Sequence, residues 1–143
     1  MLIVTVLRSK GDSVVTVPPS ATVRELLETL AEHRIGAVVV SSGAGIAGIV
    51  SERDVVRHLH ASGAGVLEQT VGSIMTTTVV TCRRETAVDE LMTTMTERRI
   101  RHVPVVDDHG AIVGIVSIGD LVKSRISELV SERDDLVGYI GNR

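Results

Sequence analysis

The chain of 143 residues is 43% hydrophobic and 23% charged, with a net charge of −3 at neutral pH. This length allows one compact domain or two half-size units that share a core, and the slightly acidic balance argues against a nucleic-acid-binding protein. The single cysteine, Cys82, excludes an intrachain disulfide and a cysteine-based metal site, and the single aromatic residue, Tyr139, argues against stacking of single-stranded nucleic acid.

The N-terminal segment MLIVTVLRSK, residues 1–10, places its apolar residues before its basic residues. A secretory signal has the opposite order and a longer apolar run, and the chain has no stretch of about 18 apolar residues that would span a membrane. Because the lone cysteine also fits a reducing compartment, we expect a cytoplasmic protein.

A helix is predicted over residues 22–33. Its apolar residues recur at positions i, i+3, i+4 and i+7, which places them on one helix face: Val23, Leu26, Leu27 and Leu30. Thr22 followed by Glu25 is typical of a capping box at the start of such a helix. A short strand around Val15 is expected to precede it.

Two strands and a second helix are predicted next along the chain. Short apolar runs at 37–40 and 46–50 indicate buried strands, and the glycines of 43–45 indicate a hairpin turn between them. The polar sequence SERD at 51–54 is expected to begin the second helix, and residues 60–70 are predicted to form a loop.

The same pattern then occurs a second time. Residues 14–40 align with 79–105 at an offset of 65, and after one extra residue 46–54 align with 112–120 at an offset of 66. Internal repeats of this kind indicate two copies of one structural unit. The second copy is therefore expected to contain strands, and a turn between them, at 102–106, 112–116 and 107–110.

We predict an α/β fold in which two pseudo-twofold-related β-α-β-β-α repeats, 1–66 and 67–143, pack sheet to sheet into one module. A single repeat would leave one face of its small sheet uncovered. The last helix is predicted to be long, and its exposed apolar stripe leads us to expect a homodimer. The stripe comprises Ile118, Leu121, Val122, Ile126, Leu129, Val130 and Val137.

Both copies place a serine three residues before an aspartate, at Ser51 and Asp54 and at Ser117 and Asp120. One interpretation is a pair of helix caps, each worth about 1 kcal/mol. The other is a ligand site, because a helix start and a hydroxyl group suit a phosphate, and a carboxylate one turn later suits the two hydroxyl groups of a ribose. A glycine three positions before each serine would allow close approach to the backbone.

The repeated layout resembles a tandem pair of cystathionine β-synthase (CBS) domains, often called a Bateman module. The resemblance covers nearly the whole chain and rests on the Gly–apolar–apolar–Ser–x–x–Asp segment of both copies, on RHVPVVD at 101–107 and on SIMT at 73–76. The sequence SERD in the first copy, with RHVPV and SIGDLVK in the second, is similar to short, stand-alone bacterial members.

The resemblance implies that adenosine nucleotides bind between the two copies. It assigns the ribose to Asp54 in one site and to Asp120 in the other, with the hydroxyl groups of Ser51 and Ser117 beside them. These assignments favour the ligand-site interpretation, although one serine can serve as both a cap and a ligand contact.

Further contacts follow from the same resemblance. A basic pair that faces phosphates in related modules maps to Arg101 and His102, and the first copy lacks basic residues at the equivalent positions. Arg53 and Lys10 are further candidates for phosphate contact. Apolar residues that would surround adenine are Val15 and Ala37 for the Asp120 site, and Val80 and Ile100 for the Asp54 site. For the neighbouring Arg98 and Arg99, a solvated helix end remains an equal alternative.

The expected function is that of a regulatory module that binds an adenine nucleotide, AMP first and otherwise ATP, ADP, NAD or S-adenosylmethionine. It would act on an unknown protein partner in trans, without catalysis, nucleic acid or membrane binding. The alternatives are an interaction or dimerisation module that binds no ligand and, less favoured, an enzyme acting on nucleotides.

Other candidate sites in the sequence are weak. A metal site at His58 and His60 is not favoured, because the two residues do not share a helix face. The basic neighbours of Cys82 would lower the pKa of its thiol, but no base accompanies it to make it a nucleophile.

Overall fold

The computed structural model describes residues 1–43 and 45–141. The predicted turn at 43–45 therefore falls partly outside the described residues. The helices and strands, in chain order, are α1 (Ile3–Lys10), β1 (Thr16–Val17), α2 (Val23–His33), β2 (Ala37–Ser41), β3 (Ile46–Ser51), α3 (Glu52–Ser62), the 3₁₀ helix η1 (Ala64–Glu68), α4 (Val71–Ile74), α5 (Val88–Arg98), β4 (His102–Val106), β5 (Ile112–Ser117) and α6 (Ile118–Gly141).

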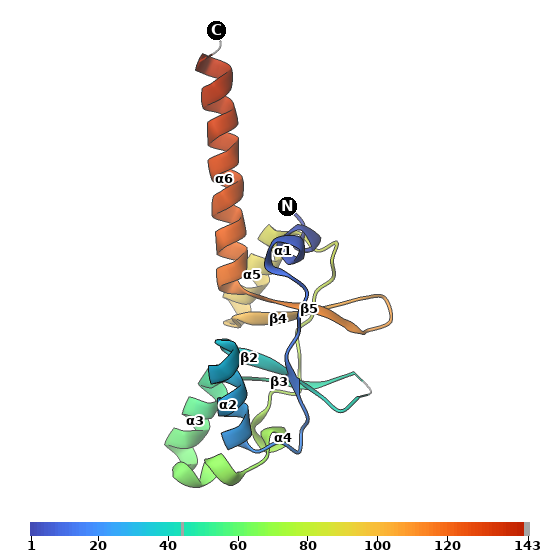
Figure 1. Ribbon diagram of the computed structural model, residues 1–143, viewed down its shortest axis with the longest axis vertical. Helices are drawn as coiled ribbons and strands as arrows, with labels where there is room; N and C mark the ends of the chain where they lie inside the picture. The colour runs from blue at the N-terminus through green and yellow to red at the C-terminus, as the bar shows by residue number, and fades with distance from the viewer. Residues whose placement is uncertain (44, 142–143) are drawn as a thin grey trace.

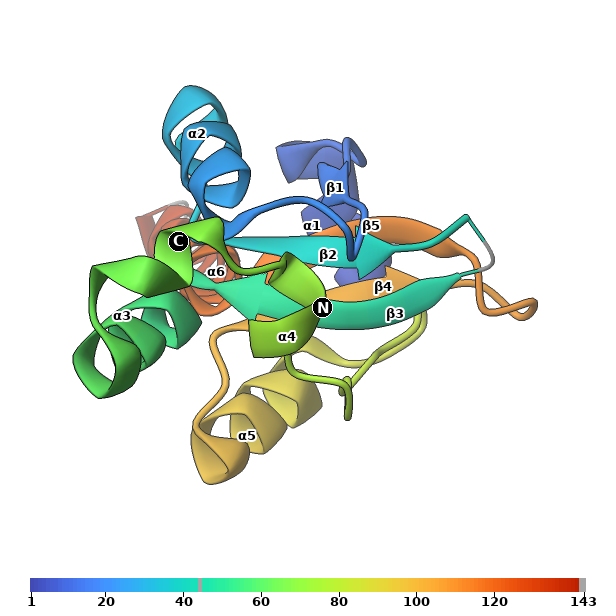
Figure 2. The ribbon, with the colours of Figure 1, turned by 90° about the horizontal axis from the view of Figure 1, so that it is seen from below.

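Two small sheets face each other between the helices (Figures 1 and 2). In one sheet β1 pairs with β2 in parallel and β2 pairs with β3 antiparallel, whereas the other sheet is the antiparallel pair β4–β5. The registers are equivalent, because Val39 lies opposite Ile49 and Pro104 lies opposite Ile115. Both hairpins also shift register at the same point, after Val40 and after Val105. The repeat in the sequence is therefore a repeat in the backbone.

Most predicted elements are confirmed. The helix predicted over 22–33 is α2, where the hydroxyl of Thr22 accepts a hydrogen bond from the Glu25 amide at 3.1 Å. The predicted strands correspond to β2, β3, β4 and β5, and helices begin directly after Ser51 and Ser117. The strand expected at the start of the second copy is reduced to one bridge between Cys82 and β4.

The loop predicted for residues 60–70 is wrong. Helix α3 continues to Ser62 and ends at Gly63, whose φ of 75° suits glycine, and η1 follows immediately. Val66 of η1 is fully buried in the core beside α2 and β2. Its burial supplies the apolar contact that turns a polar, glycine-rich segment into an ordered helix.

Each sheet covers its own hydrophobic core. The first core contains residues from Val17 to Ile74, and the second combines residues from Cys82 to Leu121 with Ile3, Val6 and Leu7 of α1. Helix α1 therefore precedes the first copy in sequence but packs in the second half, and α4 precedes the second copy but packs in the first half (Figure 1). The two halves exchange their leading segments.

These leading segments explain the glycines of the repeated motif. A β-carbon at Gly48 would lie 2.7 Å from the carbonyl oxygen of Thr76, and one at Gly114 would lie 2.6 Å from Cδ2 of Leu7. The close approach expected at these glycines is confirmed, but the group that approaches is the exchanged segment of the other half.

The last helix extends beyond the rest of the molecule (Figure 1). Leu121 is the only residue of α6 that is buried among those described, and the other large apolar side chains of the helix are half-buried or exposed. Within the described ranges, no helix combines the length and the apolarity that crossing a membrane requires.

Candidate functional site

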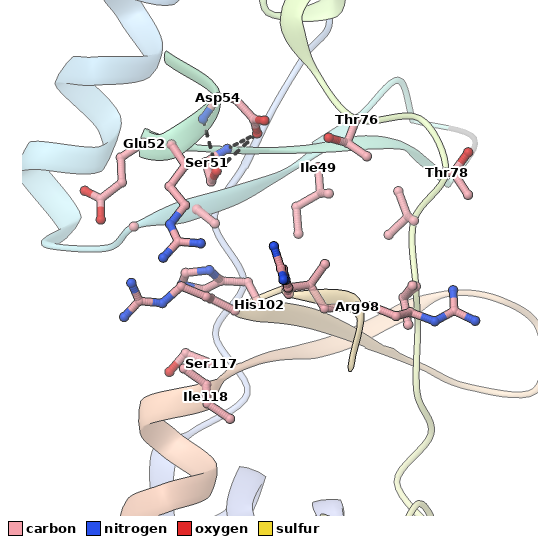
Figure 3. A pocket seen from close by; sticks show the side chains of 18 of the residues that line it. Ile49, Ser51, Glu52, Asp54, Thr76, Thr78, Arg98, His102, Ser117 and Ile118 are labelled. Carbon is pink, nitrogen blue, oxygen red and sulfur yellow. Dashed lines mark hydrogen bonds between the residues drawn. The ribbon is translucent and has the colours of Figure 1, made fainter. Parts of the chain in front are cut away.

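A cavity of about 570 Å³ opens between the two halves, and its size falls in the range of small-molecule sites. Its walls come from the start of β2, the β3–α3 junction, residues 76–80, the α5–β4 junction and the β5–α6 junction. Figure 3 shows Ser51 and Asp54 on one wall and His102 and Arg98 on the opposite wall. A ligand in this cavity would contact both copies of the repeat.

Ser51 and Asp54 form a complete capping box at the start of α3. The Ser51 amide donates to Asp54 Oδ2 at 2.8 Å, the Ser51 hydroxyl donates to the same oxygen at 3.1 Å, and the Asp54 amide donates to Ser51 Oγ at 3.4 Å. The helix-cap interpretation of this pair is thus confirmed. Asp54 still lines the cavity, and its second oxygen, Oδ1, accepts no hydrogen bond from the described residues.

The start of α3 offers less to a phosphate than its position suggests. The Glu52 amide donates to the Gly36 carbonyl at 3.0 Å, and the Asp54 amide is engaged by Ser51. Two of the amides that a helix start usually presents to an anion are therefore already paired. Side chains, rather than these amides, must supply most of the positive charge for a ligand.

The second serine–aspartate pair has a different environment. Asp120 Oδ2 accepts from the Ser117 amide at 2.8 Å and from Lys10 Nζ at 2.6 Å, and Lys10 also donates to the Ile115 carbonyl at 2.6 Å. Burial opposes ionisation of Asp120, but the Lys10 ammonium and the Ser117 hydrogen bonds together lower its pKa. Its carboxylate is therefore held ionised by a cation of the chain itself, and neither Asp120 nor Lys10 lies on the cavity.

His102 begins β4 and lines the cavity close to Arg101. Partial burial and the nearby positive charges of Lys10 and Arg101 lower the pKa of its imidazole, outweighing the opposing carboxylates of Asp120 and Glu52. The lowered pKa favours the neutral form of the ring near pH 7.

Nine of the twelve predicted site residues line this one cavity: Ala37, Ser51, Arg53, Asp54, Val80, Ile100, Arg101, His102 and Ser117. The other three, Lys10, Val15 and Asp120, do not. Ala37 was expected beside Asp120 but lies on the Asp54 cavity, and Lys10 binds Asp120 directly. The ligand roles of all twelve remain predictions.

Several lining residues were not among the predicted site residues. Arg57 lies one helical turn after Arg53, and this spacing of four places both side chains on the same face of α3. Arg98 and Arg99, left open between a helix end and a ligand contact, both line the cavity. The spacing of the α3 arginines was visible in the sequence; the contribution of residues 76–80 was not, because it depends on how the halves pack.

The remaining reactive groups contribute nothing here. Burial raises the pKa of the Cys82 thiol to about 11, so the lowered thiol pKa that its basic neighbours suggested is wrong and the thiol is unreactive at neutral pH. Among the described residues, no three His, Cys, Asp or Glu side chains are grouped so as to hold a metal ion.

Comparison with known proteins gives the same architecture. Residues 10–61 and 71–127 both match the CBS domain family. The chain is 32–36% identical to three curated relatives over 77–94% of its own length, and it spans 57–69% of theirs.

Three solved structures are similar over most of the chain. The CBS-domain protein ATU1752 of Agrobacterium tumefaciens is 44% identical with a TM-score of 0.85, covering 87% of this chain and 99% of its own. The Pyrobaculum aerophilum CBS domain protein PAE2072, complexed with AMP, is 28% identical with a TM-score of 0.78 and coverage of 92% and 99%. The CBS domain pair of MJ0100, complexed with 5-methylthioadenosine and S-adenosyl-L-methionine, is 26% identical with a TM-score of 0.76 and coverage of 93% and 98%. With both repeats matched and the paired fold in place, the chain belongs to the CBS domain family as a tandem CBS pair.

Proposed function

We propose that the protein is a regulatory module that binds an adenine nucleotide in the Asp54 cavity and passes its occupancy to a protein partner in trans. The observation that carries the proposal is a cavity between the copies, into which the first copy contributes Asp54 and the second contributes Arg101 and His102. The complexes of related CBS pairs with AMP and with S-adenosyl-L-methionine support an adenosine compound as the ligand.

Each part of such a ligand has a complementary group. The unengaged Oδ1 of Asp54 accepts from the ribose hydroxyls, and Arg101 with His102 receives the phosphate. The half-buried apolar side chains of Val80 and Ile100 lie on the same cavity and contact the adenine ring. AMP is the simplest ligand with these three parts; ADP, ATP, NAD and S-adenosylmethionine share the adenosine portion.

The ligand acts by shifting the population of conformations. It contacts α3 of the first half and β4 of the second, so it favours the relative position of the halves that suits both contacts. A partner that binds one position more tightly then senses the ligand through a coupling free energy.

Titration of the purified chain with AMP, ADP, ATP, NAD and S-adenosylmethionine by isothermal calorimetry tests the binding proposal. We expect one binding event per chain with at least one of these compounds, and mass spectrometry of small molecules released from the purified protein should find the same compound. Absence of binding by every compound, on a chain freed of endogenous ligand by unfolding and refolding, would contradict the proposal.

The exposed face of α6 favours a second role, homodimerisation. Val122, Ile126, Leu129, Leu136 and Ile140 are each at least 39% exposed and follow one another at spacings of three, four or seven residues. This is the repeat of a two-helix seam, which a second copy of α6 would cover. Sedimentation equilibrium should give twice the mass of the chain, and Ile126→Glu with Leu129→Glu should return it to a monomer.

A further inference from the structure

Family membership leaves the ligand's charge open, since related CBS pairs are complexed with AMP and with S-adenosyl-L-methionine. The side chains that line the cavity are more informative. Five arginines line it, against the two carboxylates of Glu52 and Asp54, and one oxygen of Asp54 is engaged in the helix cap. The arginines are Arg53, Arg57, Arg98, Arg99 and Arg101.

None of these five arginines forms an ion pair or a side-chain hydrogen bond within residues 1–43 and 45–141. Arginines elsewhere in the chain do find partners, as Arg24 does with Glu68 and Arg125 with Glu128. Like charges gathered around one cavity repel each other, and the repulsion is relieved when an anion enters. The five side chains are therefore available to a ligand.

Helix dipoles do not account for the cluster. Arg98 and Arg99 lie at the C-terminal end of α5, where a cation is favourable in any case. Arg53 lies in the first turn of α3, where the dipole disfavours a cation, and Arg57 lies one turn later on the same face. A positive side chain at the start of α3 is better explained by an anion in the cavity.

The repeat itself does not account for the cluster either. At the offsets of 65 and 66, the equivalents of the five arginines in the other half are Gly119, Lys123, His33, Arg34 and Gly36. Only two of those five positions, Lys123 and Arg34, carry a permanent positive charge. The excess of arginine is specific to the cavity that Asp54 lines and is absent from the symmetry-related positions around Asp120.

We propose that the Asp54 cavity takes a nucleotide with a chain of two or more phosphates, which the arginines of α3 and of the α5–β4 junction hold from both sides. This inference rests on the proposed nucleotide-binding function. A single phosphate dianion engages one or two guanidinium groups, each of which binds it through two parallel hydrogen bonds. Five guanidinium groups match the larger number of oxygens on a diphosphate or triphosphate.

The experiment compares AMP, ADP, ATP and inorganic triphosphate by calorimetry in one buffer with EDTA, at two salt concentrations. We expect ATP to bind about tenfold more tightly than AMP or better, and its affinity to fall more steeply with salt. Inorganic triphosphate should displace ATP in competition, because it occupies the same guanidinium groups.

Two double variants make the test specific. Arg57→Gln with Arg99→Gln removes two cavity charges, and Arg34→Gln with Lys123→Gln removes the charges at the two symmetry-related positions of the repeat. All four side chains are exposed, so both variants should fold, which circular dichroism confirms. We expect the cavity variant to lose about tenfold in ATP affinity and less than about threefold in AMP affinity, and the matched variant to change neither by more than about twofold.

The outcomes separate this inference from the proposed function. Equal affinity for AMP and ATP, or equal losses in the two double variants, overturns the polyphosphate assignment and leaves nucleotide binding intact. Binding of triphosphate without any nucleotide supports the arginine site and contradicts the adenosine proposal. Binding of none of the four compounds overturns both.

Discussion

The two exchanged segments differ at the point where each crosses the sheet of the opposite half. Helix α4 ends after four residues, and Thr76 then pairs through its backbone with Ile49. Helix α1 is eight residues long, and the equivalent carbonyl, that of Ile115, accepts from the ammonium group of Lys10 instead. An ammonium group thus replaces a backbone amide, and it reaches Asp120 as well.

The same Ser–x–x–Asp motif therefore has two environments. In the first half the carboxylate caps α3, lines an open cavity and leaves one oxygen without a hydrogen-bond donor among the described residues. In the second half Lys10 neutralises the carboxylate. The difference is set by the group that the exchanged leading segment brings to each motif. This group is the backbone of Thr76 in the first half and the ammonium group of Lys10 in the second. Internal symmetry of sequence does not imply two equal sites.

The largest expected effect comes from removing each carboxylate in turn. Asp54→Asn keeps an oxygen for the helix cap but removes the charge that receives the ribose, so nucleotide affinity should fall about 10- to 100-fold, the cost of a charged hydrogen bond. Asp120→Asn should change affinity by less than about threefold, since Asp120 is not on the cavity. Calorimetry on both variants measures the difference. Equal losses in affinity would mean that ligand binds beside both aspartates and that the two halves are not functionally distinct.

The sequence predicted the parts of the molecule that local patterns determine. The apolar spacing of α2, the buried runs of β2 and β4 and the serine caps of α3 and α6 are all visible within a few residues, and the repeat fixed which elements are equivalent. The segment 60–70 was misjudged because its order comes from one tertiary contact, the burial of Val66.

Lys10 shows what the sequence could not place. It was a candidate for phosphate contact with no assigned site, and the exchange of leading segments carries it to Asp120 in the second half. The exchange depends on long-range packing of α1 against Gly114, and no local pattern in the sequence reports such packing. The gathering of the cavity arginines also depends on long-range packing, because α3 and α5 come from different halves.

A smaller effect is expected from Lys10→Ala, which removes the neutralising cation. Asp120 and Lys10 are 27% and 31% exposed, so solvent screens the pair and its loss should cost about 0.5–1 kcal/mol of unfolding free energy. Because the pKa of Asp120 is lowered in the folded protein, this contribution is present above the carboxyl's ordinary pKa and disappears as pH falls through the lowered value. Denaturant titration at pH 7 and at successively lower pH should therefore show the difference between variant and wild type shrinking once the pH falls below the carboxyl's ordinary pKa.

The same variant also tests the difference between the halves directly. With the ammonium removed, the Asp120 carboxylate loses its partner in the chain and becomes free to accept a ribose, so calorimetry should detect a second, weaker binding event in addition to the first. Lys123→Ala is the control, because it removes a charge from the same helix that carries Asp120 without touching the carboxylate. A stoichiometry of one for both variants would mean that the backbone of α1, rather than the Lys10 ammonium, keeps ligand away from Asp120.

The smallest expected effect is a pH dependence of binding that belongs to one histidine. The pKa of His102 is lowered by burial and by the positive charges of Lys10 and Arg101, against the opposing carboxylates of Asp120 and Glu52. Without ligand, the unfolded chain therefore binds more protons than the folded chain between the lowered pKa and about pH 6.5. The free energy of unfolding falls as the pH drops through this window. A phosphate in the cavity reverses the balance, because it favours the charged imidazole.

Nucleotide binding should consequently take up part of a proton, and affinity should rise about twofold to fivefold between pH 8 and pH 6. Calorimetry in two buffers of different ionisation heat counts the protons directly. The phosphate of the ligand titrates in the same range, so the informative quantity is the difference between wild type and His102→Gln, which removes the imidazole only. If the variant keeps the full pH dependence, the phosphate alone titrates, and His102 then lies on the cavity without facing the anion that the arginines receive.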